Sequence, residues 1–312
     1  MDGIYFSEFR DEYWGEPGEY DLYAEVYVGR ACVDDEKDVN NFVSKTIDYI
    51  STNRNESYLK EVLMAGEGLG WQYSGGDYLD QLIDGSSKNG YKTVGIPSSK
   101  YKITKLYDRN RVWPVSELIN RINNNVHIIN HDGHSGYNNN MKMQISDVDS
   151  LTNSKYCFIY SLGCHAGSFD RDDCIAEHLT VKTGHGAFAG IWNAGYGLGN
   201  SSSTDGASQR FIREFWDAVF GENIYSIGKA NHDSKEDNNY LIDNEDMKYV
   251  YFGLNLFGDP SISFIMPKDK GKTKNVLSNE KPIFFRFIKQ ILILEQLFLK
   301  HPFLKTIVER LT

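Results

Sequence analysis

The stretch YCFIYSLGCHAGSF, residues 156–169, joins a strand-forming run directly to a turn of small residues. Its first half is continuously apolar and rich in β-forming residues, which is typical of a buried strand. The turn places Cys164 at the mouth of that strand. A cysteine there has two open interpretations: a small buried hydrophobic residue, or a nucleophile held at the edge of a sheet.

The same pattern occurs earlier in the chain, where VHIIN (126–130) runs into HDGHSG (131–136) and places His134 after a strand. Further strands are expected at 24–33, 91–96 and 186–194, and helices at 34–53, 113–125, 146–155 and 209–221. Alternating strands and helices predict an α/β fold with a mostly parallel sheet. Because ligands bind beyond the carboxyl ends of such strands, we expect His134 and Cys164 over one sheet edge.

Composition bounds the class of protein. The chain has 312 residues, a net charge of −10 and 24% charged residues, an ordinary globular composition. The acidic balance argues against nucleic acid as a partner, because phosphate binding needs a clustered basic face. The four cysteines show neither CxxC pairing nor zinc-finger spacing. The first residues show no signal-peptide pattern.

The chain is expected to divide into four parts. Residues 1–57 would be a remnant of an N-terminal subdomain, and residues 58–266 the main domain. Residues 267–282 are polar and lysine-rich, which predicts a linker. Residues 283–312 have a helical, amphipathic pattern with too many charges for a membrane span. That tail would pack on its own domain, on a partner or on a membrane surface.

The order of several segments resembles the gingipain family of cysteine peptidases, in the clan that also holds caspases, legumain and clostripain. The family carries a histidine in a glycine-flanked turn after a strand, and its nucleophile follows about thirty residues later. Here NHDGHS and SLGCHAGSF place His134 and Cys164 30 residues apart. The resemblance covers roughly residues 4–264 and includes the segments EVYVGR, MAGEG, YSGGDYLDQL and NLFGDPSISF. It implies a caspase-like three-layer domain, followed here by a helical C-terminal extension.

The resemblance also implies roles for single residues. Cys164 would be the nucleophile and His134 the general base and acid, with Glu67 near the histidine to orient it. The backbone N–H groups of Ser135 and Cys164 would bind the oxyanion. Many relatives have glycine in place of Ser135. The substrate-site residues would be Asp77, at the base of a pocket for a basic P1 side chain, and Trp192, in a pocket wall.

The resemblance therefore implies a cysteine endopeptidase that hydrolyses peptide bonds through an acyl-enzyme, after Arg or Lys. Such chemistry needs no cofactor, and calcium bound by the acidic start DEYWGEPGEYD (11–21) would be structural. Relatives are typically exported, which implies a secreted or cell-surface protein.

Interpretations in which these residues have structural, binding or metal-ligating roles also stay open. Glu67 could be a turn residue, and Asp77 a helix cap. A catalytically silent binding or assembly module would keep the same fold. His127, His131 and His134 have spacings that metal ligands use on helices, but on a strand and turn they would not share a face. We therefore expect no catalytic metal.

Overall fold

A computed structural model describes residues 3–7, 10–14, 22, 26–171 and 173–268 of the chain. The chain divides into two compact units, Met1–Lys268 and Asp269–Thr312. The predicted linker and amphipathic tail, apart from residues 267–268, lie outside the described residues. So does much of the acidic segment at 11–21. No helix of the described ranges is both long and apolar enough to cross a membrane.

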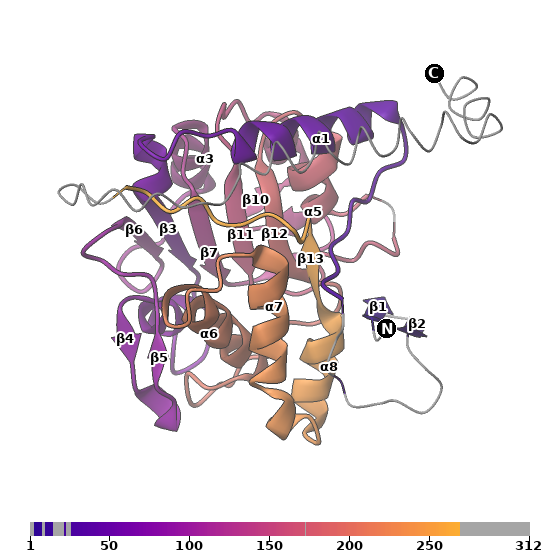
Figure 1. Cartoon of the computed structure of the whole chain (residues 1–312). Helices are drawn as coiled ribbons and strands as arrows, with labels where there is room; N and C mark the ends of the chain where they lie inside the picture. Colours follow the sequence, from indigo (N-terminus) through magenta and orange to yellow (C-terminus); the bar gives the residue numbers. More distant parts are fainter. Residues whose placement is uncertain (1–2, 8–9, 15–21, 23–25, 172, 269–312) are drawn as a thin grey trace, which may run out of the picture. The chain divides into compact units, whose positions relative to one another are not determined.

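A six-stranded sheet forms the centre of the first unit (Figure 1). All neighbouring strands run parallel except the edge strand β13, which pairs antiparallel with β12. The order across the sheet is β13 (Leu254–Phe257), β12 (Ala187–Asn193), β11 (Cys157–Ser161), β7 (Ile128–Asp132), β3 (Glu61–Gly66) and β6 (Lys102–Tyr107). This confirms the predicted α/β class with a mostly parallel sheet.

Helices cover both faces of the sheet, so the unit has three layers. The helices are α1 (Glu36–Ile50), α2 (Gly75–Leu79), α3 (Val115–Asn123), α4 (Ile145–Asp149), α5 (Ile175–Glu177), α6 (Ala207–Phe220), α7 (Ile227–Glu236) and α8 (Glu245–Gly253). Residues of α2, α6, α7 and α8 belong to one hydrophobic cluster, and residues of α3, α4 and α5 to another. Short strands pair outside the central sheet: β1 (Gly3–Ser7) with β2 (Arg10–Trp14), β4 (Gly85–Ser86) with β5 (Thr93–Val94), and β8 (Ser135–Gly136), β9 (Asn139–Asn140) and β10 (Met143–Gln144) together. The described residues also form five short 3-10 or π helices: η1 (Ser57–Lys60), η2 (Asp80–Leu82), η3 (Lys88–Gly90), η4 (His178–Lys182) and η5 (Asn239–Leu241).

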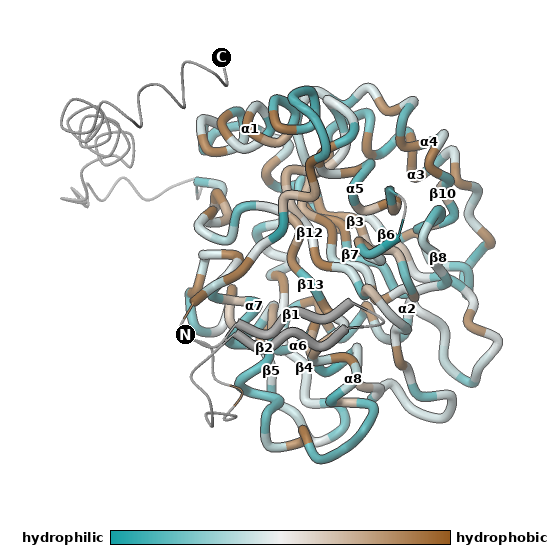
Figure 2. Tube along the Cα trace, turned by 90° about the vertical axis from the view of Figure 1, so that its right-hand side faces the viewer, coloured by the Kyte–Doolittle hydropathy of each residue, from teal (hydrophilic) through white to brown (hydrophobic). Residues whose placement is uncertain are grey.

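The central strands are apolar on both faces because each face meets a helix layer. Along β11, Phe158 and Tyr160 join the first cluster, whereas Cys157 and Ile159 join the second. This alternation is the two-residue period of a strand, and burial on both sides explains the continuous apolar run in the sequence. Figure 2 shows the hydrophobic residues concentrated in these strands.

The strand expected at residues 24–33 is wrong for its described part, residues 26–33. Only Arg30 makes a bridge there, to Phe257 of β13. The Arg30 N–H donates to the Leu256 carbonyl at 2.8 Å, and the Gly258 N–H donates to the Arg30 carbonyl at 2.8 Å. A Cβ at Gly29 would lie 2.2 Å from the Gly258 carbonyl oxygen, so the two backbones pass too closely for a side chain there.

Helix α1 lies within the helix expected at residues 34–53, but four of its apolar side chains are exposed. Asp38, Lys45 and Tyr49 are buried, whereas the apolar side chains Val39, Val43, Ile47 and Ile50 are exposed. Lys45 donates from Nζ to the carbonyls of Leu179 and Thr180 at 3.0 and 3.1 Å. Burial lowers the pKa of Lys45 to about 7. The inward face therefore includes a buried lysine that is held by backbone carbonyls distant in sequence.

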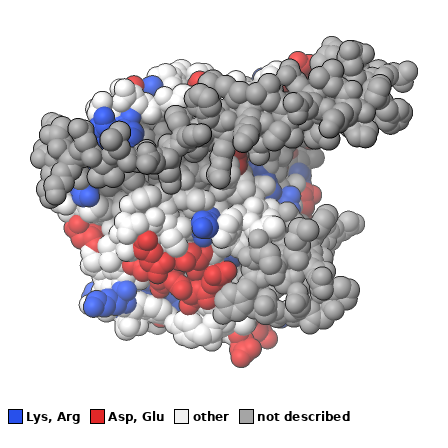
Figure 3. Space-filling model, in the orientation of Figure 1, with Lys and Arg blue, Asp and Glu red and all other residues white. Residues whose placement is uncertain are grey.

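An acidic cluster lies around α7, where Figure 3 shows Asp and Glu side chains gathered on one face. Carboxylate oxygens of Glu222, Asp233 and Asp237 all lie within 4.8 Å of one another. Burial, and then repulsion from Glu222 and Asp237, raises the pKa of Asp233 to about 7. The ionised form of Asp233 is therefore less favourable in the folded protein than in the unfolded chain.

We expect Asp233→Asn to raise the melting temperature at about pH 8, since the folded-state pKa is raised and the ionised carboxylate opposes folding there. The difference should shrink as the pH falls through the folded pKa of about 7 towards the ordinary value of 3.8. Thermal unfolding at several pH values measures this. The exposed Asp243, changed to Asn, is the control. An equal effect of Asp233→Asn at all pH values would contradict the interpretation.

Candidate active site

The two predicted loops leave neighbouring strands at the same edge of the sheet. Strands β7 and β11 pair in parallel, with His131 opposite Ser161. His134 lies two residues beyond the end of β7, and Cys164 three residues beyond the end of β11. The two strands are therefore neighbours, and their parallel pairing brings both loops to the carboxyl ends.

The two loops also touch. An ideal Cβ placed on Gly163 would lie 1.9 Å from the Ser135 hydroxyl oxygen and 3.2 Å from the Gly133 carbonyl oxygen. Any side chain at residue 163 would therefore push the histidine loop away from the cysteine loop. The residues next to Cys164 and His134 are thus in direct contact, and a glycine makes that contact sterically feasible.

Cys164 and His134 differ in environment. The Cys164 thiol is half-buried, and its Sγ lies 3.7 Å from the Gly197 carbonyl oxygen, to which it donates. Burial raises the pKa of the Cys164 thiol above its ordinary value. His134 is exposed, and its imidazole makes no hydrogen bond with any described residue. In the free protein the thiol therefore has a raised pKa, and His134 lies exposed in the neighbouring loop.

Alkylation should report this state directly. We expect the rate at which iodoacetamide labels Cys164 to keep rising with pH through the ordinary thiol pKa, because burial holds the thiol protonated and only the thiolate attacks. Mass spectrometry of the labelled peptide over a pH series measures the rate. A rate that is already at its plateau near neutral pH would show a preformed thiolate–imidazolium pair and contradict the expectation.

Glu67 contacts a different histidine from the one expected. The Glu67 side chain is buried, and its Oε1 lies 3.1 Å from Nε2 of His131, a fully buried residue of β7. Within the described ranges Glu67 makes no hydrogen bond to His134. The Glu67 carboxylate therefore contacts His131 in the strand instead of His134 in the loop. The hydrogen bond between His131 and Glu67 could not be read from segment order.

Ser135, in the histidine loop, faces Gly163 of the cysteine loop. It is half-buried, and its hydroxyl oxygen accepts a hydrogen bond from Asn140 Nδ2 at 2.6 Å. Residue 135 also pairs with Asn140 in the β8–β9 hairpin. The role of its backbone N–H in binding an oxyanion stays a prediction, as does that of the Cys164 N–H.

Asp77 has the contacts of a helix-capping residue. It is the third residue of α2, where its Oδ2 accepts from the Ser74 N–H and hydroxyl, each at 2.8 Å. Its other carboxylate oxygen is paired with Arg109, which also binds Asp80. Burial tends to raise the pKa of Asp77, but the bonds from Ser74 and the charge of Arg109 outweigh this and lower it. Its charge is therefore already balanced within the protein.

The structure places Trp192 in the core and corrects its expected place in a pocket wall. The indole is fully buried, packs edge-on against Phe257 with ring centroids 5.6 Å apart, and donates to Asn140 Oδ1 at 3.4 Å. Trp192 points into the layer that α3–α5 cover, because alternate residues of β12 face opposite sides of the sheet.

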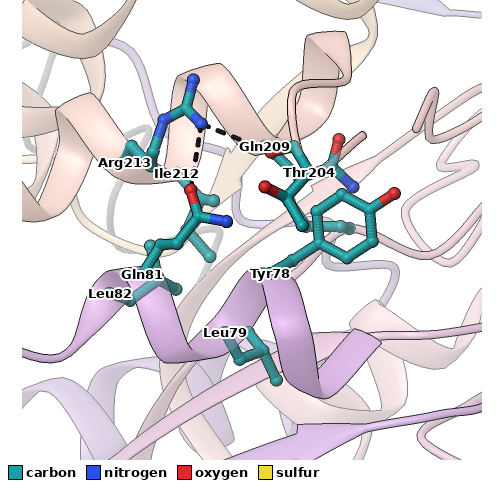
Figure 4. Close-up of a pocket in the computed structure, with 9 residues that line it drawn as sticks. Tyr78, Leu79, Gln81, Leu82, Thr204, Gln209, Ile212 and Arg213 are labelled. Carbon is teal, nitrogen blue, oxygen red and sulfur yellow. Dashed lines mark hydrogen bonds between the residues drawn. The ribbon is translucent and has the colours of Figure 1, made fainter. Parts of the chain in front are cut away.

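The loop after β12, residues 194–206, is fastened to α2 and α6. Tyr78 donates its hydroxyl to the carbonyls of Asn200 and Ser203 at 2.6 and 2.9 Å. The buried guanidinium of Arg213 contacts the Thr204 carbonyl at 3.4 Å and the Asp205 carboxylate at 2.7 Å. Figure 4 shows Tyr78 and Arg213 beside Thr204 in a small hollow that Leu162 also lines. These anchors hold the loop beside the cysteine turn.

The three histidines of the metal interpretation do not converge. His127, at the opposite end of β7, is buried between the Leu59 carbonyl and the Tyr49 hydroxyl, at 3.0 and 2.9 Å. Burial lowers its pKa to about 4. In the described part of the chain, only the acidic trio at α7 has the spacing of a metal-binding group, and it contains no histidine.

Solved structures of proteases share this arrangement of strands and helices. A crystal structure of the Arg-specific cysteine proteinase gingipain R (RgpB) is similar with a TM-score of 0.65 and 20% identity, over 79% of this chain and 57% of that one. A complex of the pro- and mature domains of RgpB from Porphyromonas gingivalis has a TM-score of 0.61 and 20% identity, over 79% and 58% of the two chains. A third structure, described only as that of a protease, has a TM-score of 0.60 and 18% identity, over 79% and 57%. No curated protein sequence matches.

The fold is therefore caspase-like, as in these cysteine proteinases. The sequence profile of peptidase family C25 matches residues 2–265, and the chain belongs to that family. The chain spans 57% of the length of the first gingipain structure.

Proposed function

We propose that this protein is a cysteine endopeptidase in which Cys164 and His134 form the catalytic dyad. The observation that carries the proposal is the contact between the loops of these residues, Gly163 against Ser135, at the carboxyl ends of adjacent parallel strands. Membership of a peptidase family supports the reaction class. Protein and peptide substrates follow from that class.

The reaction would begin with a proton transfer. Because burial keeps the Cys164 thiol protonated, the His134 imidazole takes its proton as Sγ attacks the peptide carbonyl carbon. The tetrahedral oxyanion is met by the backbone N–H groups of Ser135 and Cys164. The His134 imidazolium then protonates the leaving amine, and the C–N bond breaks to give a thioester. A water molecule, deprotonated by His134, hydrolyses the thioester and restores the thiol.

We further propose a preference for Arg or Lys at P1. The Arg specificity of gingipain R, whose structure is similar, supports it, as does the acidic balance of this chain. Asp77 supports it less, since its carboxylate is already bound to Ser74 and Arg109. The reaction would need no cofactor, and any bound calcium would have a structural role. We also propose that the protein is exported or lies at the cell surface.

Hydrolysis of fluorogenic peptides with Arg, Lys, Asp, Asn or Leu at P1 tests the function. We expect the highest kcat/KM with Arg or Lys and no loss on adding EDTA. The highest value with another residue would reject the basic preference but retain the mechanism. No hydrolysis of any peptide by reduced protein would reject the peptidase and favour a binding module.

A matched variant separates the two possible roles of Asp77. If its carboxylate bound the P1 side chain, Asp77→Asn would lower the ratio of kcat/KM for Arg over Leu substrates. The contacts of Asp77 in α2 instead predict an unchanged ratio with a lower melting temperature, because the bond to Arg109 is lost.

A further inference from the structure

A chain of hydrogen bonds lies buried beneath the two catalytic loops. It joins five side chains from separate segments: Trp192, Asn140, Ser161, His131 and Glu67. The first four are fully buried, and Glu67 is 7% exposed. Burying a polar group costs free energy unless the group is hydrogen-bonded. These hydrogen bonds therefore restrict the geometry of every segment that they join.

The indole at one end sets the direction of the chain. Trp192 can only donate, so the Asn140 atom that faces it at 3.4 Å is the carbonyl oxygen. The two Nδ2 hydrogens of Asn140 are then directed to two hydroxyls, Ser161 at 2.8 Å and Ser135 at 2.6 Å. Each hydrogen of the amide has its own acceptor.

Ser161 is the central member. Its oxygen accepts from Asn140 Nδ2 and from the Gly163 N–H at 3.3 Å, so both lone pairs are used. Its own proton is left for His131 Nδ1 at 2.8 Å. His131 therefore accepts at Nδ1 and donates from Nε2 to Glu67. Every donor in the series has an acceptor when His131 is the neutral Nε2–H tautomer.

The chain of hydrogen bonds contacts both catalytic loops at their turns. Asn140 holds Ser135 in the histidine loop, and Ser161 holds the Gly163 N–H in the cysteine loop. Glu67 packs under the histidine loop as well, since a Cβ at Gly133 would lie 2.6 Å from its Cδ. The proposed oxyanion donors, Ser135 and Cys164, lie in or next to these anchored turns.

We propose that His131, Ser161 and Asn140 are positioning residues that hold the oxyanion-binding backbone of the two loops in register for catalysis. The proposal rests on the proposed cysteine peptidase function. It assigns these three buried residues to the alignment of backbone N–H groups, and none of them to contact with the substrate.

Ser161→Ala tests the role because it removes a single oxygen and with it three bonds of the chain. We expect kcat to fall about 10- to 100-fold with KM changed less than about threefold, since misplacing a transition-state contact by about 1 Å costs this much. Iodoacetamide labelling of Cys164 should change less than about twofold, because alkylation uses no oxyanion site. Ser234→Ala is the matched control: its buried hydroxyl donates to the Asn231 carbonyl at 2.8 Å, in α7.

Variants of Glu67 provide a second test of the proposal. Glu67→Gln keeps an oxygen that accepts from His131 and should retain kcat within about threefold, whereas Glu67→Leu should match Ser161→Ala. A kcat within about twofold of wild type for Ser161→Ala, or losses equal to those of Ser234→Ala, would overturn the proposal.

A measurement that does not depend on catalysis distinguishes this proposal from the proposed peptidase function. Nitrogen-15 shifts of His131 should show an unprotonated Nδ1 and a protonated Nε2, and Ser161→Ala should shift the backbone amides of both Ser135 and Gly163. If wild-type protein hydrolyses no peptide but these shifts occur, the function fails and the hydrogen-bonded chain stands. Shifts confined to the immediate neighbours of residue 161 in β11 would show that Ser161 is not connected to the two loops by hydrogen bonds, and would overturn the proposal.

Discussion

Replacing Cys164 with alanine is expected to lower kcat for peptide hydrolysis by about 10⁴-fold or more, because the nucleophile is lost and no acyl-enzyme can form. The thiol is half-buried, and its hydrogen bond to the Gly197 carbonyl, at 3.7 Å, is a weak sulfur contact. The fold should therefore be little disturbed. Hydrolysis of the best fluorogenic peptide, measured beside the melting temperature, tests this.

Cys32→Ala is the control for this loss. Cys32 is also half-buried, and burial raises its pKa to about 12, so its thiol is a poor nucleophile. We expect wild-type kcat for this variant. Hydrolysis that persists in Cys164→Ala and disappears in Cys32→Ala would place the nucleophile elsewhere.

The second large effect is expected for His134→Ala. Loss of the proton acceptor and donor should lower kcat by about 10²- to 10⁴-fold. Because the imidazole is exposed and bonds to no described residue, the melting temperature should not change. Added imidazole should restore part of the activity by entering the space that the side chain leaves. Steady-state kinetics with and without imidazole measure both effects.

His185→Ala provides the comparison for His134. His185 is half-buried and bonds through Nδ1 to the Asn153 carbonyl at 3.0 Å, and it lies at the other end of the β11–β12 pair. This variant should keep wild-type kcat. A loss that is as large in His185→Ala, or a His134→Ala variant with normal kcat, would remove His134 from the mechanism.

The edge where the site lies could be predicted because its signals are local. Each catalytic loop follows a run of apolar residues long enough to be a doubly buried strand, and glycines flank both His134 and Cys164. Parallel pairing then follows from the alternation of strands and helices. The contact of Gly163 with Ser135 follows from that pairing together with the turns.

Backbone groups distant in sequence decide other parts of the fold, which local patterns do not predict. Helix α1 turns Lys45 inward because carbonyls of residues 179 and 180 accept its hydrogen bonds, and no periodicity within the helix contains that information. Residues 26–33 pass beside β13 with one bridge, although their composition favours a strand.

The chain of hydrogen bonds below the site could not be predicted, for a related reason. The sequence offers only a metal-ligand interpretation for His131, because its partners Glu67 and Ser161 lie at the ends of other strands that the sheet brings together. One local signal was available: HD follows directly on the buried run VHIIN, and buried polar residues at a strand end need partners.

The most direct test of the central claim is covalent labelling with peptidyl ketone inhibitors that carry Arg or Leu at P1, read by mass spectrometry after digestion. The account predicts one adduct, on Cys164, that forms much more slowly in His134→Ala and is absent in Cys164→Ala. An adduct on Cys32, or hydrolysis of peptides by a protein whose Cys164 stays unlabelled, would contradict it.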